Sequence, residues 1–526
     1  MHSDSDHRAR SSLTLRRDAI AQIAVERFGV RYLYPIQRYV IAGIIDRRDQ
    51  IVVLPTGGGK SLCFQLSAEL LDGVTLVVVP LLSLLEDQRR SMEQRGIRCG
   101  VLRGGQSRDE RYRHLREAAA GRIKILYTTP ESLLGLAGTR PFDALPVAHL
   151  VIDEAHCVSE WGETFRPSYL SLCELVRSRG FPVVTAFTAT ASRPVLRRIR
   201  ELIFAGRPAS RTLENPDRPN IRYSVQPVLS KSQGALRVIR GSPGCCVLFT
   251  MSRRGAEALA RTLRRTMPER DVYFYHAGLG REERRAVEAW FLRSPSGVLA
   301  ATSAYGLGVD KPNIRTVIHA DIPPSVEAYL QESGRAGRDG RPAQAVLLVD
   351  EGERGLSEGA AATKAPTRAT PTAESNAEST AEEHSPGMAL YAANHSRCRR
   401  ELLLSLIDQP SVPCSGCDVC LGETVPEDPA TPDLLELARR YPRRFTLREA
   451  SLLLEGRFTS ADFEGYFGHS RFFGLLETWE PEEIREALEN LAAAGRVYVP
   501  DRGPWRGRLR PGKFPRHPLL HRRRKC

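Results

Sequence analysis

Short runs of consecutive apolar residues alternate along the chain with longer stretches in which apolar positions recur every three or four residues. Between residues 50 and 189 the apolar runs are Ile51–Leu54, Thr75–Val79, Ile123–Tyr127, His149–Ile152 and Val183–Phe187. A second series follows at Cys245–Phe249, Val272–Tyr275, Val298–Ala301, Thr316–His319 and Ala345–Val349. Continuous apolar strands separated by helices are typical of parallel sheets buried on both faces. The pattern therefore predicts two α/β domains in tandem.

The pattern changes after the second series. Residues 351–389 contain no aromatic residue and many Ala, Thr, Ser and Glu, so they offer too little apolar area to offset the entropy of ordering. We expect a flexible insert there. Beyond it lie four clustered cysteines and a region with helical periodicity that closes in a Val-Tyr-Val strand. The expected divisions are a first α/β domain at 1–215, a second at 216–350, the insert at 351–389, a cysteine module at 390–424, a helical domain at 425–510 and a basic tail at 511–526.

Composition and charge narrow the function classes. The chain has 526 residues, of which 41% are hydrophobic and 26% charged, which excludes a single small module and a mostly disordered chain. The net charge is +14, and Asp501–Cys526 carries ten of the basic residues. This excess favours a polyanionic partner, either nucleic acid or an anionic membrane surface. The start of the chain lacks an apolar core and no apolar stretch is long enough to span a bilayer, so we expect a cytoplasmic protein.

A glycine-rich loop lies between the first predicted strand and a helical pattern. Its residues Thr56, Gly57, Gly58 and Gly59 lead directly into Lys60 and Ser61. Glycines let backbone N–H groups close around phosphate oxygens at a helix N-terminus, Lys60 can reach the β- and γ-phosphates, and Ser61 can ligate Mg²⁺. The loop predicts a binding site for a nucleoside triphosphate with Mg²⁺.

Two adjacent carboxylates, Asp153 and Glu154, follow the predicted strand at His149–Ile152. Ligands of open α/β sheets bind outside the carboxyl ends of the strands. Asp153 can therefore hold Mg²⁺, and Glu154 can orient or activate an attacking water.

Four of the eleven cysteines cluster, as Cys398 and Cys414-x-x-Cys417-x-x-Cys420. Four thiolates suffice for a closed tetrahedral Zn²⁺ site, which stabilises a fold rather than catalyses. An iron–sulfur cluster and a redox-active pair are the alternatives. The neighbouring Arg399 and Arg400 are interpreted as a solvated face, with contact to phosphate as the other reading.

Further motifs carry a resemblance to a known family. They are Pro80–Gln88, Thr188–Thr190, Asp217–Ile221, His276–Leu279, Gly306–Pro312 and Gln331–Gly340. With the glycine-rich loop and the Asp153–His156 tetrad, the chain resembles the RecQ family of DNA helicases, in the DEAH-box group of superfamily two. The resemblance implies two RecA-like domains, a zinc module and a winged helix, without a further C-terminal helical domain. It also implies an ATP-dependent helicase that moves 3′ to 5′ on DNA in recombination and repair.

The resemblance assigns further nucleotide-site residues. Arg338 corresponds to the arginine finger, while Arg335 and Gln331 link the two domains. Always-charged guanidiniums on the second domain complete the pocket only when the domains close, which couples hydrolysis to motion. Gln37 corresponds to the adenine-contacting glutamine, and Tyr34, which replaces the family's stacking arginine, can stack on the base.

The resemblance also assigns DNA-contact residues. Trp161, Phe165 and Arg166 lie in an aromatic-rich loop just after the tetrad, where rings can stack on unpaired bases. Thr188 and Thr190 connect hydrolysis to the DNA strand across the superfamily.

Competing readings remain at this stage. The region 425–510 resembles a winged helix, although a purely structural helical domain is the alternative. The implied partners are single-stranded, forked or branched DNA, with a single-stranded-DNA-binding protein as a candidate, no membrane, and a monomeric state associated with the nucleoid in a bacterium. The alternatives in function are an RNA helicase or non-unwinding translocase, and a DNA-tethering scaffold with a decayed ATP site.

Overall fold

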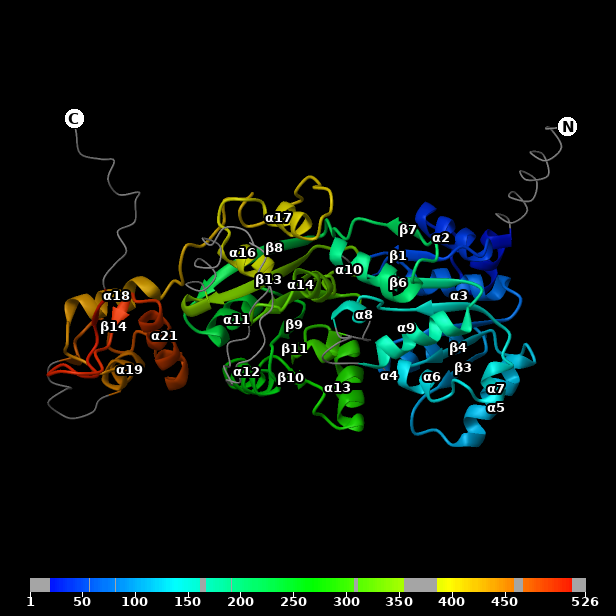
Figure 1. The fold of residues 1–526 in the computed structure, drawn as a ribbon. Coiled ribbons are helices and arrows are strands. Elements are labelled where there is room, and N and C mark those ends of the chain that lie inside the picture. Colours follow the sequence, from blue (N-terminus) through cyan, green and yellow to red (C-terminus); the bar gives the residue numbers. More distant parts are fainter. Residues whose placement is uncertain are drawn as a thin grey trace, which may run out of the picture. The chain divides into compact units, whose positions relative to one another are not determined.

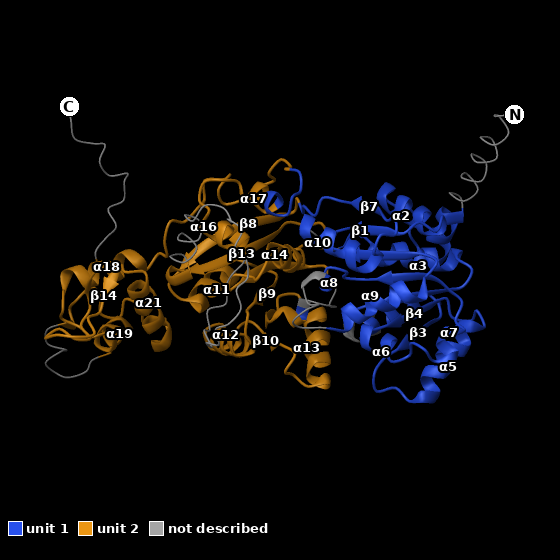
Figure 2. Cartoon of the chain, in the orientation of Figure 1, with its two compact units in different colours: residues 1–218, 305–310, 404–410 blue, residues 219–304, 311–403, 411–526 orange. Residues whose placement is uncertain are grey.

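A computed structural model describes residues 19–55, 57–80, 82–160, 167–190, 192–306, 311–353, 386–457 and 467–512. The chain divides into two compact units, coloured separately in Figure 2. Unit 1 comprises residues 1–218, 305–310 and 404–410. Unit 2 comprises residues 219–304, 311–403 and 411–526.

Unit 1 is built on a seven-stranded sheet in the order β3-β4-β2-β5-β6-β1-β7, in which every pairing is parallel. Its strands are β1 (Gln50–Val53), β2 (Val74–Val78), β3 (Cys99–Leu102), β4 (Ile125–Thr128), β5 (Val147–Ile152), β6 (Val184–Thr188) and β7 (Ser210–Leu213). Its α-helices, labelled in Figure 1, are α2 (Pro35–Ile45), α3 (Lys60–Leu70), α4 (Leu82–Gln94), α5 (Arg108–Ala119), α6 (Pro130–Leu134), α7 (Arg140–Asp143), α8 (Cys157–Glu160), α9 (Ser168–Arg179) and α10 (Arg193–Ile199). The π-helical turn η1 (Arg200–Phe204) follows α10. A further helix covers residues 19–28.

Both faces of this sheet are buried. Alternate residues of one strand enter different cores: Ile51 and Val53 of β1 belong to one cluster, and Val52 belongs to the other. Strand β2 divides in the same way, because successive side chains of a strand point to opposite faces. This arrangement explains why the central strands are apolar throughout and confirms the predicted doubly covered parallel sheet.

Unit 2 contains a second sheet, with six parallel strands in the order β10-β11-β9-β12-β13-β8. The strands are β8 (Ile221–Val228), β9 (Cys245–Phe249), β10 (Val272–Tyr275), β11 (Val298–Ala301), β12 (Ile314–His319) and β13 (Ala343–Asp350). The helices are α11 (Lys231–Arg240), α12 (Arg253–Thr266), α13 (Arg281–Arg293), the 3₁₀ turn η2 (Ser303–Gly306) and α14 (Val326–Ser333). Two tandem parallel-sheet domains of the RecA-like type are therefore confirmed.

The segment expected to be a flexible insert, 351–389, is folded at both of its ends. Residues 351–353 are helical, and α16 (Pro386–Ala393) begins inside the expected insert with Met388 and Ala389 buried. The apolar run that starts at Met388 supplies the buried face that the preceding sequence lacks. The expectation of flexibility was wrong for these ends, and residues 354–385 lie outside the described residues.

The C-terminal part of the chain begins with α17 (Arg399–Leu406), which follows the first cysteine and whose last residues, 404–406, belong to unit 1. Its later elements are α18 (Thr431–Arg440), α19 (Leu447–Glu455), α21 (Pro481–Ala493), β14 (Val497–Tyr498) and β15 (Arg510–Pro511), with the two short strands antiparallel. Helix α19 is delimited by a capping box between Thr446 and Glu449 and by left-handed Gly456 at its end. The three helices share one apolar core with Val497 and Leu509.

No helix in the described part of the chain is long and apolar enough to cross a membrane.

Candidate active site and cysteine cluster

The glycine-rich loop connects the carboxyl end of β1 to the start of α3. Gly57 and Gly59 have φ values of 86° and 81°, a left-handed conformation that only glycine adopts at little cost. Gly59 is the N-cap of α3, so Lys60 and Ser61 occupy the first turn of the helix. The free N–H groups and positive dipole end of that turn suit an anion. Thr56 lies outside the described residues.

Lys60 contacts the carboxylates that follow β5. Its Nζ lies 3.1 Å from Glu154 Oε1, although the two residues are 94 positions apart in sequence. Asp153 is only 4% exposed, and its backbone N–H donates to Val78 O of β2. Burial, together with the adjacent Glu154 charge, raises the pKa of Asp153 to about 6 even though Lys60 opposes the shift. A nearby cation would favour the ionised form of Asp153, and with Ser61 this carboxylate offers the oxygen ligands that Mg²⁺ prefers.

Sequence reasoning missed a polar chain that holds Ser61. Gln88 of α4 donates from Nε2 to Ser61 Oγ at 3.0 Å. Gln65 of α3 donates to Gln88 Oε1 at 2.7 Å and lies 3.1 Å from the Tyr127 hydroxyl. Gln88 closes the Pro80–Gln88 motif, which was noted only as part of a resemblance. The number of residues between Ser61 and Gln88 did not predict their contact, because that contact depends on how α4 packs beside α3.

His156 connects the tetrad to the neighbouring strand. Its Nδ1 lies 3.0 Å from Thr188 Oγ1 at the end of β6 and 3.4 Å from Glu154 Oε2. Thr188 Oγ1 in turn donates to Thr190 O at 2.9 Å. A short polar path thus runs from the Glu154 carboxylate to the segment after β6. The predicted DNA-contact residues Trp161, Phe165 and Arg166 lie outside the described residues.

Gln37 sits against the phosphate loop. This buried side chain donates to Gly58 O at 2.9 Å and accepts from the Tyr34 backbone N–H at 3.0 Å. A Cβ at position 59 would lie 2.3 Å from Gln37 Nε2, so the close approach requires glycine there. Tyr34 is 62% exposed, and its ring meets Tyr32 edge-on at 5.6 Å between centroids. The structure therefore brings Gln37 to the loop and leaves the Tyr34 ring accessible.

The remaining predicted nucleotide-site residues belong to unit 2. Gln331 lies in α14, and Arg335 and Arg338 follow it in a loop that leads to β13. Arg335 is only 4% exposed, whereas Arg338 is half-buried.

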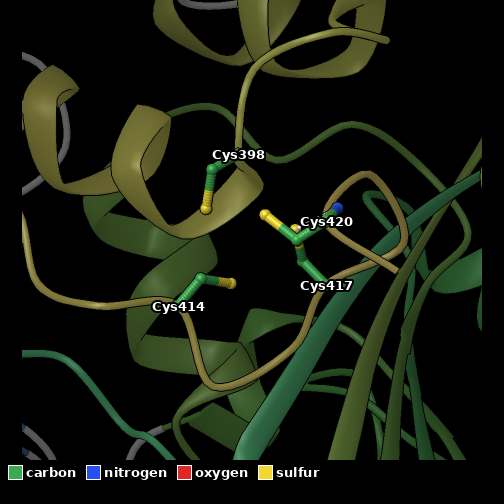
Figure 3. Close-up of side chains that lie close together, drawn as sticks. All are labelled: Cys398, Cys414, Cys417 and Cys420. Atoms are coloured by element: carbon green, nitrogen blue, oxygen red, sulfur yellow. Dashed lines mark hydrogen bonds between the residues drawn. The ribbon is translucent and has the colours of Figure 1, made fainter. Parts of the chain in front are cut away.

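The four clustered cysteines converge as the spacing predicted. Cys398 directly precedes α17, the other three lie on the loop after it, and their sulfurs lie within 4.8 Å of one another (Figure 3). Four sulfurs at about 2.3 Å from a tetrahedral Zn²⁺ would be about 3.8 Å apart, so the cluster fits this ion with little movement. Cys417 is buried and Cys420 exposed.

Arg399 and Arg400 do not form a solvated face, and that interpretation was wrong. Both side chains are 1% exposed. Arg399 makes a bidentate pair with Asp418 at 2.9 and 3.1 Å and donates to Tyr391 O. Arg400 donates to Ile221 O and to Ser415 Oγ, both at 2.7 Å. The local sequence could not reveal that these two arginines are buried. Asp418 and Ser415 of the cysteine loop and Ile221 of β8, which bind them, are distant in sequence.

Comparison with known proteins agrees with this geometry. The DEAD/DEAH box helicase family matches residues 34–199, and the helicase conserved C-terminal domain family matches residues 231–340. The chain is 38% identical over 343 residues to the probable ATP-dependent DNA helicase RecS of Bacillus subtilis, covering 64% of this chain and 68% of that protein. It is 33% identical over 397 residues to the ATP-dependent DNA helicase RecQ of Haemophilus influenzae, covering 75% of this chain and 62% of that protein.

Among solved structures, the DUF1998 helicase MrfA bound to DNA superposes with a TM-score of 0.54 at 20% identity, covering 63% of this chain and 51% of that one. This likeness concerns the fold alone. The sequence matches extend across both parallel-sheet domains, and they include the loop, tetrad and arginine-bearing segments located above. The chain therefore belongs to the RecQ family of ATP-dependent DNA helicases.

Proposed function

We propose that this chain hydrolyses ATP to move 3′ to 5′ along single-stranded DNA and to separate forked or branched duplexes. The observation that carries the proposal is the ion pair between Lys60 and Glu154 beside buried Asp153. It brings a phosphate-binding cation and two carboxylates to one point at the carboxyl edge of the sheet. Such an arrangement suits phosphoryl transfer, in which catalysis consists of positioning and charge stabilisation.

The site residues of unit 1 have separate roles in this proposal. The loop N–H groups and Lys60 bind the phosphates. Ser61 and Asp153 would hold Mg²⁺, which would supply positive charge next to the phosphate oxygens. Glu154 orients the attacking water. Release of Glu154 from Lys60 accompanies this step, because an incoming phosphate competes for the ammonium group.

The arginines of unit 2 supply the remaining charge. We assign Arg338 as the arginine finger and Arg335 and Gln331 as residues that link the two domains when nucleotide is bound. A contribution of this kind is worth about 10³-fold or more in turnover in related phosphoryl-transfer enzymes. Dependence on a second domain ties hydrolysis to domain closure.

The DNA side of the proposal rests on the path from Glu154 through His156 to Thr188 and Thr190. A strand bound near these threonines can alter the orientation of Glu154. We further propose that Trp161, Phe165 and Arg166 contact the strand and that the cysteine cluster holds Zn²⁺ as a structural ion. The region 425–510 would act as a winged helix. Its exposed Trp505 and Tyr498, each with an arginine over the ring, suit nucleic acid.

Strand separation on duplexes with a 3′ tail, a 5′ tail or a fork tests the proposal. We expect unwinding of the 3′-tailed and forked substrates with ATP and none with a non-hydrolysable analogue. Lys60→Ala should abolish it, whereas Lys124→Ala should not. Lys124 is a matched control because it directly precedes β4. It therefore lies at the amino ends of the strands, whereas the proposed site lies at their carboxyl ends.

Two outcomes would contradict the proposal. Equal ATPase stimulation by single-stranded DNA and RNA would remove the DNA specificity. Full unwinding by the Lys60→Ala protein would indicate that the bound nucleotide has no catalytic part.

A further inference from the structure

The start of β8 is held by the cysteine cluster and its surrounding loop. Ser415 Oγ donates to Pro219 O at 2.5 Å, and Arg400 donates to Ile221 O at 2.7 Å. Asp418 donates its backbone N–H to Tyr223 O and accepts from Val225 N–H at 3.0 Å. Four contacts within seven residues fix this segment, and two of them come from side chains that are nearly inaccessible to solvent.

Between Pro219 and Ile221, Asn220 points the other way, into the loop that carries the two arginines. We call residues 334–342 the arginine loop. Asn220 Nδ2 donates to Gly337 O at 2.8 Å and to Arg341 O at 2.9 Å, so both hydrogens of one amide are used. The Asn220 carbonyl accepts from Ala343 N–H at 3.0 Å, where the loop enters β13.

The loop is shaped to receive this side chain. Gly337 has a φ of 54°, and a Cβ there would lie 2.4 Å from Asn220 Nδ2 and 2.6 Å from Arg341 O. Its N–H donates to Ile314 O at 2.8 Å, which ties the same residue to β12. Arg335 lies two positions before Gly337, and Arg338 lies directly after it. The Asn220 amide therefore sits at the bend that sets the direction of both guanidiniums.

We infer that Asn220 is a positioning residue for Arg335 and Arg338. The residues that flank the clustered cysteines hold the backbone around Asn220 in place. The inference rests on the proposed role of Arg338 in hydrolysis. A guanidinium must be placed to within about 0.5 Å to stabilise a transition state, and such precision requires a supporting shell of fixed hydrogen bonds. Asn220 supplies such hydrogen bonds to the backbone on either side of Arg338, at Gly337 O and Arg341 O. This role accounts for the Asp217–Ile221 motif, to which the proposed function assigns no task.

The test is a double-mutant cycle between Asn220→Asp and Arg338→Ala. Aspartate keeps the shape but has no N–H donor, and it presents an acceptor to two carbonyl oxygens. We expect Asn220→Asp to lower the kcat of DNA-stimulated hydrolysis about tenfold, with the KM for ATP changed by less than about threefold. In the Arg338→Ala background the same change should lower single-turnover hydrolysis by less than about twofold, because its effect passes through Arg338.

Asn490→Asp is the matched control. Its amide also donates to a distant backbone carbonyl in unit 2, Leu229 O at 2.9 Å, but it lies on α21. We expect its kcat to equal that of the unaltered protein. Metal content and the thermal midpoint report whether each variant is folded, and Asn220→Ala repeats the cycle without the added charge.

The outcomes separate the two proposals. Suppose that Arg338→Ala lowers turnover. If Asn220→Asp then leaves the kcat of the parent unchanged, or lowers turnover by the same factor in the parent and in the Arg338→Ala protein, Asn220 does not position the arginine. The inference then fails, whereas the assignment of the arginine finger stands. If Arg338→Ala leaves turnover unchanged, the assignment of the arginine finger and the inference that depends on it both fail.

Discussion

Folding disfavours the ionised form of Asp153 in the nucleotide-free protein, and replacing this residue with asparagine should remove that cost. Its pKa rises from the ordinary value of 3.8 to about 6, chiefly because burial disfavours the charge. A rise of about two pKa units corresponds to about 3 kcal/mol of folding free energy that the ionised carboxylate forfeits. Asparagine has nearly the same shape and can keep the hydrogen bond that Glu154 N–H donates to Oδ1 at 3.0 Å.

The sign follows from linkage. Because the folded-state pKa is raised, the stability of the protonated form is fully present below pH 3.8 and is lost as the pH rises through 6. Asp153→Asn should therefore match the parent near pH 4 and exceed it at pH 8 by about 3 kcal/mol. For a domain the size of unit 1, that difference raises the thermal midpoint by about 6–12 °C.

Thermal unfolding of the parent and the variant at pH 4.5 and pH 8 measures the difference, and titrating groups that do not interact with Asp153 cancel in the comparison. Mg²⁺ should raise the midpoint of the parent at pH 8 and leave that of the variant unchanged, because the ion favours the ionised carboxylate. A variant less stable than the parent at pH 8, or a gain that is larger at pH 4.5, would refute the reasoning. Over the same range, kcat/KM for ATP should fall about tenfold from pH 7 to pH 5 at limiting Mg²⁺.

Three further predictions concern other parts of the molecule. Arg399→Met should destabilise the protein by about 3–5 kcal/mol in urea unfolding, because it leaves the buried Asp418 charge unpaired, and adding Asp418→Leu should recover part of the loss. Cys417→Ser should reduce bound zinc from one ion per chain to a small fraction in elemental analysis, and iron in the unaltered protein would contradict the assignment. Gln37→Ala should raise the KM for ATP about tenfold and leave that for GTP unchanged, and equal turnover of both nucleotides by the parent would exclude base recognition by this residue.

The interior of each sheet could be predicted from the sequence, whereas part of its edges could not. All of the strands predicted from apolar runs are present, within a few residues of the expected bounds. In the two large sheets the strands that were not predicted are β3, β7 and β8, and each lies at an edge of its sheet. The two-residue β15, which pairs with β14, was not predicted either. An edge strand is covered less completely, and β8 alternates buried with exposed residues. A continuous apolar run therefore marks chiefly the strands with neighbours on both sides, although β10 was also predicted from such a run and lies at an edge.

The candidate site shows the same division between local and distant information. Lys60, Ser61, Asp153 and the cysteine cluster could be located because their chemistry requires particular residues at short spacings. The contacts of Gln88 with Ser61, and of Arg400 with Ile221, join residues 27 and 179 positions apart. Contacts between residues so far apart in sequence depend on helix packing and on the order of the strands, so they become visible only once the whole fold is known. The arginine pair after Cys398 was misread for this reason, since its carboxylate and carbonyl partners are not adjacent in sequence.

The charges of Lys60, Asp153 and Glu154 depend on one another, and this dependence links the proposed binding of nucleotide to that of metal. In the nucleotide-free protein Lys60 faces Glu154, with Asp153 beside it, so one ammonium group offsets a carboxylate that would otherwise raise the pKa of its neighbour further. Phosphate groups that drew Lys60 away would remove this compensation, and a divalent cation held by Asp153 would supply the positive charge in its place. Under the proposed function, nucleotide and metal binding would therefore be coupled within unit 1 by its own residues. Arg335 and Arg338 belong to unit 2, so under the proposed function they would act on the chemical step separately from this exchange within unit 1.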